Sequence, residues 1–417
     1  MRLRWLFGFA LAAGAIGAGA WLLYRRQPRR PAATPIVGTR LFETVVSHVR
    51  TYSVDSLDDD ELYRRAAAGI VDELDDPYAV LVLPGRHDPL TEDAPAPGGL
   101  FVDRRDGLIV IVSVVPGSPA DSSGLRRGDR LIGVDSTLVD ASRLDLSLKL
   151  LEGRPGSRVA LRVRRSGVRG PVVLEMVRGP VSWNEAVSAE PEGGVVRIRV
   201  RRFVPGLADS VRRRLEAARG AGVRGIALDL RGVVGGGLPD GVALADLFLD
   251  PGQRLATSRG RHAGASFALR DSTASPYDSI PLAVLVDGGT AGAAEAAAGA
   301  LQDHDRAAVL GATTFGRGVT SNSFPLGGGA SLRLTTALWM TPSGREIQRP
   351  PPRADGDSIP RPRFKTDGGR VVLGGGGIIP DRAIADSGGG DQVLAEARSL
   401  LIRAGTARRV LALVSAR

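Results

Sequence analysis

A short apolar run that ends at a glycine turn places the strictest limit on the fold of this chain. Leu282 to Val286 carries no polar side chain, and Asp287-Gly288-Gly289 follows it directly. A segment of mostly small residues comes next, over 291–300, and then a second apolar run begins. A run of this length before a glycine turn predicts a buried strand, and the small-residue segment predicts a packed helix. The unit is therefore typical of an α/β core.

Further segments extend this α/β core over residues 181–405. The alternation of apolar residues with arginine at 195–200 predicts a half-exposed strand, and the apolar run that ends at Leu230 predicts a second buried one. Residues 349–370 are rich in Pro, Arg and Asp, which predicts an exposed insertion. The other predicted elements of this core are an amphipathic helix over 207–219, a strand over 330–340 and a last helix over about 392–404, before a C-terminal tail over 406–417.

The N-terminus contains a segment that is able to cross a membrane. Trp5 to Tyr24 has no charged residue, arginines stand on both sides of it, and aromatic residues stand at its ends. As a helix this run spans about 30 Å, one hydrocarbon core. We expect an uncleaved signal anchor over 5–24 within an N-terminal region of 1–35 that ends in a linker. A cleaved signal peptide with a small-residue site at Ala18-Gly19-Ala20 is the alternative.

Composition excludes several classes of function. The net charge is +10, but the first 40 residues hold seven arginines and no acid, and beyond them basic and acidic residues are interspersed. This distribution argues against nucleic-acid binding. The chain has no cysteine and four scattered histidines. We therefore expect no disulfide, no metal site and no cofactor. The 417 residues suffice for two or three domains.

Two regions precede the α/β core. Residues 36–97 predict a helical segment, with helices over 41–52 and 59–74, and the second helix ends before Pro77. Residues 98–180 contain short strands that alternate with turns. Their most specific part is Gly117-Ser118-Pro119-Ala120 followed by the run GLRRGDRL that begins at Gly124.

This last pattern resembles that of PDZ domains. PDZ domains receive the C-terminus of a peptide as an added strand, and backbone amides of one loop capture its carboxylate. The resemblance implies that this loop is Gly99, Leu100, Phe101 and Val102, and that the partners are protein C-terminal peptides. A PDZ fold that serves only as a spacer or lid is the alternative.

The order of motifs over about residues 40–400 resembles the C-terminal (tail-specific) processing serine peptidases. The turn around Thr290, the loop Phe315-Gly316-Arg317-Gly318, the run TPSGREIQ from Thr341 and the end Gly377-Ile378-Ile379-Pro380-Asp381 come in the family's order. The resemblance implies an α/β core of the ClpP/crotonase-like type with an N-terminal helical segment and an inserted, β-rich PDZ domain. It also implies that the bulk of the chain lies outside the cytoplasmic membrane, in the cell envelope.

The resemblance also assigns catalytic positions, and all three carry other residues here. The family's nucleophilic serine, its lysine base and its supporting glutamine correspond to Gly292, Arg317 and Ser321. Glycine has no side chain that attacks a carbonyl. Arginine stays protonated and has no acceptor, so it cannot take a proton from a hydroxyl. We therefore expect no intact catalytic residue.

The family's oxyanion hole has a counterpart in the chain. The glycine run after Arg231 corresponds to a turn whose amide helps to form that hole, so the resemblance implies a relic at Gly235, Gly236 and Ala293. A turn that needs glycine only for close packing explains the same residues. The sequence leaves both interpretations open.

Two functions follow from these patterns. The first is a membrane-tethered, non-catalytic relative that binds protein C-termini. The alternative is an active endopeptidase that cleaves proteins near their C-termini, with Thr290 as a displaced nucleophile. His304 is a possible base, but we expect it at an exposed helix end. Glu295 matches a family glutamate, and a charge in the first turn of a helix explains it equally well. The sequence names neither the partner nor the oligomeric state.

Overall fold

A computed structural model describes most of the chain in two units, Met1–Ile70 and Val71–Arg417. The residues that it describes are 37–74, 76–84, 97–105, 107–141, 144–182, 185–218, 222–271, 273–350, 361–384 and 391–404. The predicted anchor at 5–24, its linker and the predicted tail at 406–417 lie outside them. Within the described ranges, no helix combines the length and apolarity that a membrane crossing needs.

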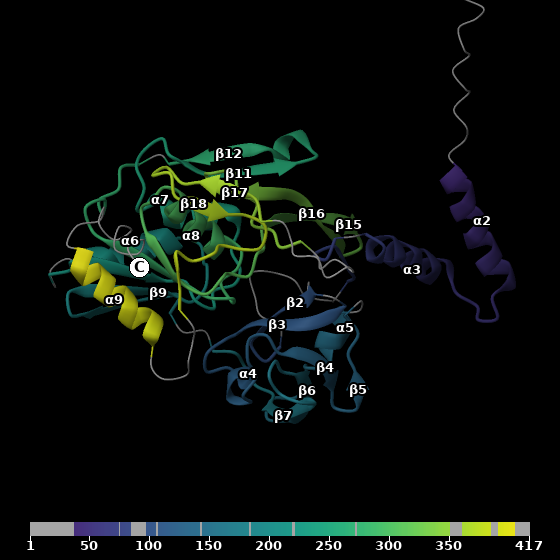
Figure 1. Cartoon of the computed structure of the whole chain (residues 1–417). Helices are drawn as coiled ribbons and strands as arrows, with labels where there is room; N and C mark the ends of the chain where they lie inside the picture. Colours follow the sequence, from purple (N-terminus) through teal and green to yellow (C-terminus); the bar gives the residue numbers. More distant parts are fainter. Residues whose placement is uncertain are drawn as a thin grey trace, which may run out of the picture. The chain divides into compact units, whose positions relative to one another are not determined.

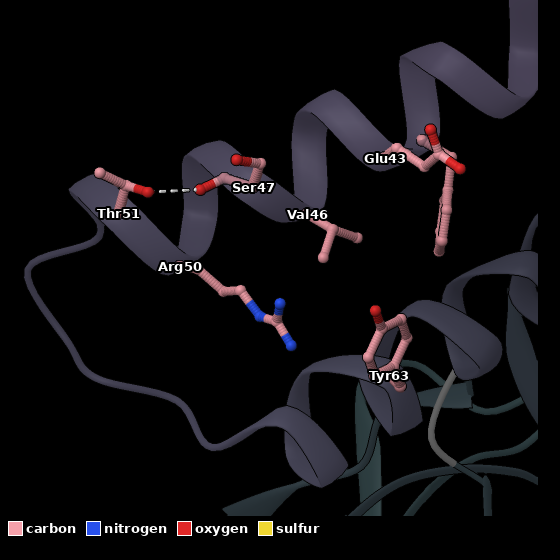
Figure 2. A pocket seen from close by; sticks show the side chains of 7 residues that line it. Glu43, Val46, Ser47, Arg50, Thr51 and Tyr63 are labelled. Carbon is pink, nitrogen blue, oxygen red and sulfur yellow. Dashed lines mark hydrogen bonds between the residues drawn. The ribbon is translucent and has the colours of Figure 1, made fainter.

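The first unit consists of helices. Helix α2 (Val37–Tyr52) begins four residues before the predicted start, and α3 (Asp59–Asp72) begins as predicted. The Asp58 carboxylate caps α3, because it accepts a hydrogen bond from the backbone amide of Glu61 at 2.7 Å. Figure 2 shows Val46 and Arg50 of α2 pointing toward the hollow beside Tyr63 of α3. The Arg50 guanidinium lies 5.9 Å from the centroid of the Tyr63 ring and also pairs with Asp59.

An antiparallel sheet forms the region in which the PDZ pattern was found. Its strand order is β2-β3-β4-β6-β7, and β5 pairs with β4. The first strand, β2, is therefore an edge of this sheet. Leu100, Ile109, Ile111 and Leu161 are fully buried in its core. The elements are β2 (Leu100–Arg105), β3 (Leu108–Val114), α4 (Pro119–Ser122), β4 (Arg130–Val134), β5 (Thr137–Leu138), α5 (Leu144–Lys149), β6 (Arg158–Arg164) and β7 (Pro171–Val177).

A second sheet forms the predicted α/β core. Its order is β19-β14-β13-β10-β9-β8, and every pair is parallel except the β8–β9 hairpin. Parallel strands with helices on both faces read as continuous apolar runs, which is why the sequence signal at 282–286 was strong. The strands are β8 (Val187–Glu192), β9 (Val195–Val200), β10 (Gly225–Asp229), β13 (Leu282–Val286), β14 (Ala308–Gly311) and β19 (Arg382–Ala383).

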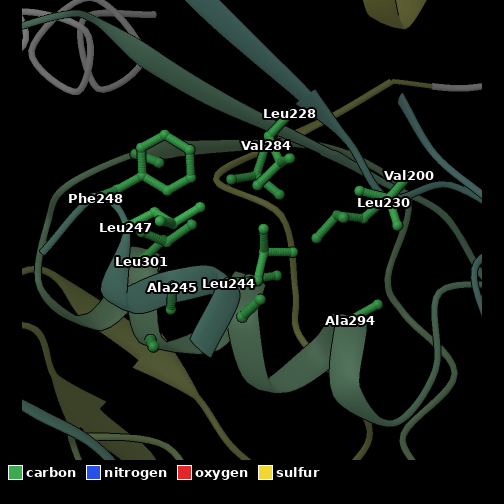
Figure 3. Packing of buried hydrophobic residues seen from close by; sticks show 14 of the residues in the cluster. Val200, Leu228, Leu230, Leu244, Ala245, Leu247, Phe248, Val284, Ala294 and Leu301 are labelled. Carbon is green, nitrogen blue, oxygen red and sulfur yellow. The ribbon is translucent and has the colours of Figure 1, made fainter. Parts of the chain in front are cut away.

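Helices cover both faces of the parallel sheet (Figure 1). On one face Leu228 and Val284 pack against Leu244 of α7 and Leu301 of α8, as Figure 3 shows. On the other face α9 buries Leu400 and Leu401 against Leu285 and its neighbours. These helices are α6 (Leu207–Ala218), α7 (Leu238–Asp246), α8 (Ala293–Asp303) and α9 (Gln392–Ala404).

A third sheet has the order β1-β16-β11-β12, with β15 paired to β16. The segment before β1 also joins it, because the Thr335 amide donates to the Asp76 carboxylate at 2.8 Å. The insertion predicted as exposed over 349–370 contains a strand, β17, and Thr366 is buried there. The pairing partner of β17 lies beyond that segment, so composition alone did not reveal it. The strands of this sheet are β1 (Val80–Val82), β11 (Arg254–Gly260), β12 (Phe267–Arg270), β15 (Val319–Gly327) and β16 (Ala330–Met340). Strands β17 (Arg363–Lys365) and β18 (Val371–Leu373) form a separate two-stranded sheet.

Candidate functional site

Three turns meet at the carboxyl end of the parallel sheet. They are the turn after β10 (230–237), the turn after β13 (287–292) and the loop 314–318 after β14. The Thr290 hydroxyl donates to the Leu230 carbonyl at 2.9 Å, and the Phe315 amide donates to the Thr290 carbonyl at 3.0 Å. Carboxyl ends of parallel strands are the usual place for ligand and active sites in α/β folds. The structure thus brings together the turns that the sequence singled out.

Gly292 precedes α8 in a conformation that favours glycine. Its φ is 65° and its ψ is −119°, outside the regions that residues with a Cβ normally occupy. The turn after β10 reaches the start of this helix, because a Cβ on Gly236 would lie 3.0 Å from the Ala293 Cβ. Gly235 and Gly236 both have positive φ. The proposed oxyanion relic therefore comprises residues that are neighbours in space.

Glu295 connects the start of α8 to the loop 314–318. Its carboxylate is fully buried and accepts hydrogen bonds from the amides of Gly292 at 3.1 Å, Gly316 at 2.7 Å and Arg317 at 2.9 Å, and from the Thr314 hydroxyl. Burial raises the pKa of this carboxyl group, while the four donors oppose the rise. Glu295 thus fixes the loop 314–318 to the head of α8, a role that neither sequence interpretation contained.

The Thr290 hydroxyl is engaged in hydrogen bonds with the backbone around it. The side chain is fully buried, and its oxygen accepts a hydrogen bond from the Asp287 amide at 3.0 Å. The hydroxyl donates to the Leu230 carbonyl at 2.9 Å and also lies 3.2 Å from the Asp287 carboxylate. An attacking hydroxyl needs access to the substrate and a base that takes its proton. Ser321 lies in β15 opposite Thr335, and none of the described hydrogen bonds connects it to the three turns.

His304 lies at a helix end, as expected, but its side chain is buried there instead of exposed. It caps the C-terminal end of α8, and its side chain is 6% exposed rather than solvated. Its Nδ1 lies 2.7 Å from the Asp367 carboxylate and its Nε2 lies 2.6 Å from the Arg254 carbonyl. The 11 residues of α8 separate it from Gly292 by about 16 Å. His304 is therefore too distant to act as a base for Thr290.

Arg317 is buried at the junction of the loop 314–318 with β2. Its side chain is 5% exposed, and its guanidinium lies 3.8 Å from the Asp103 carboxylate and 5.1 Å from the centroid of the Tyr78 ring. Burial, followed by the Asp103 charge, raises the pKa of Tyr78, and hydrogen bonds from Gln348 and Arg317 to its phenol oppose the rise. Sequence reasoning missed Asp103 and Tyr78. The sequence does not reveal that Asp103 belongs to this site, because its partner Arg317 lies far away in the chain.

Strand β3 and its neighbours lie directly on the three turns. The Ser113 hydroxyl donates to the Gly232 carbonyl at 2.8 Å, and Arg127 pairs with Asp287. A Cβ on Gly289 would lie 3.2 Å from the Val112 carbonyl, so no side chain separates the two backbones. The apolar part of this contact consists of Val112, Phe101, Val234, Ala291 and Phe315.

The predicted carboxylate-capturing loop has the conformation of a tight turn that leads into β2. Gly98 and Gly99 have φ of 84° and 91°, and the Gly99 carbonyl accepts a hydrogen bond from the Val115 amide at 2.8 Å. A Cβ on Gly99 would lie 2.5 Å from the Ser118 Cβ, which excludes a larger residue. Phe101 packs against the three turns. No group of acidic or histidine side chains suited to a metal occurs in the described parts of the chain.

Comparison with known proteins identifies the family. The model of peptidase family S41 matches residues 194–355, and the PDZ domain model matches 110–165. A carboxy-terminal-processing protease of Bartonella bacilliformis is 31% identical over 313 residues, which cover 74% of this chain and 72% of that protein. The chain belongs to the S41 family of carboxy-terminal-processing proteases. The family resemblance and the fold that the sequence predicted are thereby confirmed.

Two further relatives match over a smaller share of their own length, and a solved structure shares the fold. The carboxy-terminal processing protease CtpA of Bacillus subtilis is 29% identical over 295 residues, 70% of this chain and 63% of its own. Carboxyl-terminal-processing peptidase 2 of Arabidopsis thaliana is 32% identical, over 67% of this chain and 57% of its own. The solved photosystem II D1 C-terminal processing protease has the same fold, with a TM-score of 0.64 and 24% identity over 88% of this chain and 92% of that one.

Proposed function

We propose that this S41 member has no serine-dependent peptidase activity and binds the C-termini of other proteins through its PDZ domain. Gly292 carries the proposal, because it stands at the head of α8 where the family resemblance puts the nucleophile. A residue without a side chain cannot form an acyl-enzyme. Arg317, at the base position, remains protonated beside Asp103 and has no lone pair to accept a proton.

The surroundings of Gly292 support this proposal. Glu295 cannot substitute as the base, because four donors already occupy its carboxylate. Thr290 is a poor substitute for the nucleophile in this arrangement, because its hydroxyl is buried and donates to Leu230. The Asp287 carboxylate, 3.2 Å from this hydroxyl, already accepts two backbone amides and pairs with Arg127. The positive φ of Gly292 is also free of strain only for glycine. The turn therefore keeps its shape without the residue that would perform chemistry.

Binding of C-termini rests on the geometry around β2. This strand forms an edge of its sheet, so its outer side is able to accept an added peptide strand. The turn at Gly98 and Gly99, where both residues have positive φ, leads into this strand. We further propose that residues 5–24 anchor the chain in the membrane, with the bulk outside the cytoplasm in the cell envelope.

Two experiments test the two halves of the proposal. A serine-reactive fluorophosphonate probe should label neither the natural chain nor its Arg317→Lys variant, whereas Gly292→Ser combined with Arg317→Lys should gain labelling if the turns keep active geometry. Labelling of the natural chain that Thr290→Ala abolishes contradicts the first half.

The second experiment measures peptide binding. An apolar C-terminal peptide should bind more tightly as the free acid than as the amide. Equal affinity contradicts carboxylate capture.

A further inference from the structure

Two arginines from distant parts of the chain hold the carbonyl groups of the loop 314–318. The guanidinium carbon of Arg105, at the end of β2, lies 3.6 Å from the centroid of the Phe315 ring, and Nη2 donates to the Phe315 carbonyl at 3.1 Å. Arg349 Nη2 donates to the carbonyls of Thr314 at 3.1 Å and Gly376 at 3.2 Å. Carbonyl groups are neutral partners, so these hydrogen bonds do not themselves neutralise the two positive charges, and the carboxylate nearest to Arg105 is Asp103 at 3.4 Å.

Among the described residues around this loop, arginines outnumber carboxylates. Asp103 serves two cations, with its oxygens 3.4 Å from Arg105 Nε and 3.8 Å from Arg317 Nη2. Glu295 already accepts four hydrogen bonds. Burial lowers the pKa of Arg349, and the charge of Arg105 lowers it further. Like charges therefore repel each other here, and an added anion would relieve that repulsion.

The guanidinium of Arg349 has unused hydrogen-bonding capacity. Its Nε is buried and has no hydrogen-bond partner within the described part of the protein. A guanidinium group presents its N–H groups as a planar fork that matches the two oxygens of a carboxylate. The side chain of Arg105 is 26% exposed, so a ligand is able to reach Arg105 from solvent.

The position of Arg105 on β2 determines which residues of a bound peptide lie near its side chain. A peptide that places its terminal carboxylate at Gly99 and Leu100 and pairs antiparallel with β2 extends toward Arg105. At about 3.4 Å per residue, its side chains opposite Arg104 and Arg105 come from about four to six residues before the C-terminus. We infer that Arg105 and Arg349 bind an acidic side chain at this position, so that the preferred partner has an apolar C-terminus preceded by acidic residues. This inference depends on the proposed peptide binding.

Fluorescence anisotropy with the full-length chain tests the inference. The probes are two labelled decapeptides with the C-terminal sequence Ala-Ala-Val as the free acid, one with Asp and the other with Asn at the fifth and sixth residues from the end. We expect the Asp peptide to bind about three- to ten-fold more tightly at low salt, and the ratio to fall toward one at high salt. In Arg105→Gln and in Arg349→Gln the two peptides should bind equally.

Controls keep the result interpretable. Arg164→Gln removes an exposed arginine at the end of β6, which lies three strands away from β2, and should leave the ratio unchanged. Arg105→Glu should prefer a peptide with Lys at the two positions, which tests the contact even if Arg349→Gln does not fold. Binding of both peptides with equal affinity by the natural chain overturns the inference and leaves the proposed function intact. Binding of neither peptide overturns the proposed function itself.

Discussion

The framework of the three turns and their junction with the PDZ domain are held by different kinds of contact. Inside the framework, one buried carboxylate, Glu295, accepts hydrogen bonds from backbone amides and one hydroxyl. At the junction, Asp103 faces Arg317 and Arg105, and Arg127 faces Asp287. Hydrogen bonds in a dry interior are short-ranged and insensitive to salt, whereas the partly exposed pair of Arg127 with Asp287 is screened and the buried pair of Asp103 with Arg317 is screened much less. Salt should therefore weaken only the exposed part of the junction, and the framework should keep its hydrogen bonds.

Glu295→Ala should have the largest effect on stability. The change leaves three buried amides and the Thr314 hydroxyl without their acceptor, which costs about 3 to 5 kcal/mol. Urea unfolding monitored by tryptophan fluorescence should show a lower midpoint, and hydrogen exchange should increase in residues 314–318. Glu295→Gln keeps one acceptor oxygen and should lose less. If the two variants are equally stable, the framework does not depend on these hydrogen bonds.

Asp103→Asn should have the next largest effect, concentrated at the junction. The amide keeps the shape of the side chain but removes the charge between Arg317 and Arg105, so about 2 to 4 kcal/mol is lost. Hydrogen exchange should rise in 287–292 and in β2 while α8 stays protected. The matched control is Asp209→Asn, an exposed acid paired with Arg212 on α6, which should change little. Unchanged exchange in both variants would mean that Asp103 does not hold the junction.

Gly292→Ser should reduce stability by a smaller amount, about 1 to 3 kcal/mol, because serine would have to adopt φ near 65°. Differential scanning calorimetry should detect this change as a lower Tm. Gly69→Ser is the matched control, since Gly69 lies inside α3 with open space around it and serine has the higher helix propensity. A Gly292→Ser protein with unaltered Tm would indicate that the turn relaxes to a different conformation.

Arg127→Gln should have the smallest effect. Its side chain is 41% exposed, and exposed ion pairs contribute about 0.2 to 1 kcal/mol. The loss should disappear at 1 M salt, because screening already removes the attraction to Asp287 in the natural chain. A loss that is independent of salt would assign the contact to packing of the arginine stem on Gly289 instead.

Local patterns in the sequence predicted the framework but not the junction. The strand at 282–286 and the glycine turns were recognisable because each signal lies within a few neighbouring residues. The role of Asp103 was not recognisable, since its partner Arg317 comes from a distant segment. Arg105 and Phe315 are separated by 210 positions, and their contact exists only after two domains dock. The burial of His304 was missed for the same reason, because its partner Asp367 comes from a distant segment.

The most direct test of the central claim is proteolysis by the purified full-length chain. Mass spectrometry should detect no fragments of an unfolded substrate protein, or of a substrate with an apolar C-terminal tag, after long incubation, and Thr290→Ala should give the same result. Fragments that the natural chain produces and Thr290→Ala does not would contradict the claim that Gly292 leaves this site without a nucleophile.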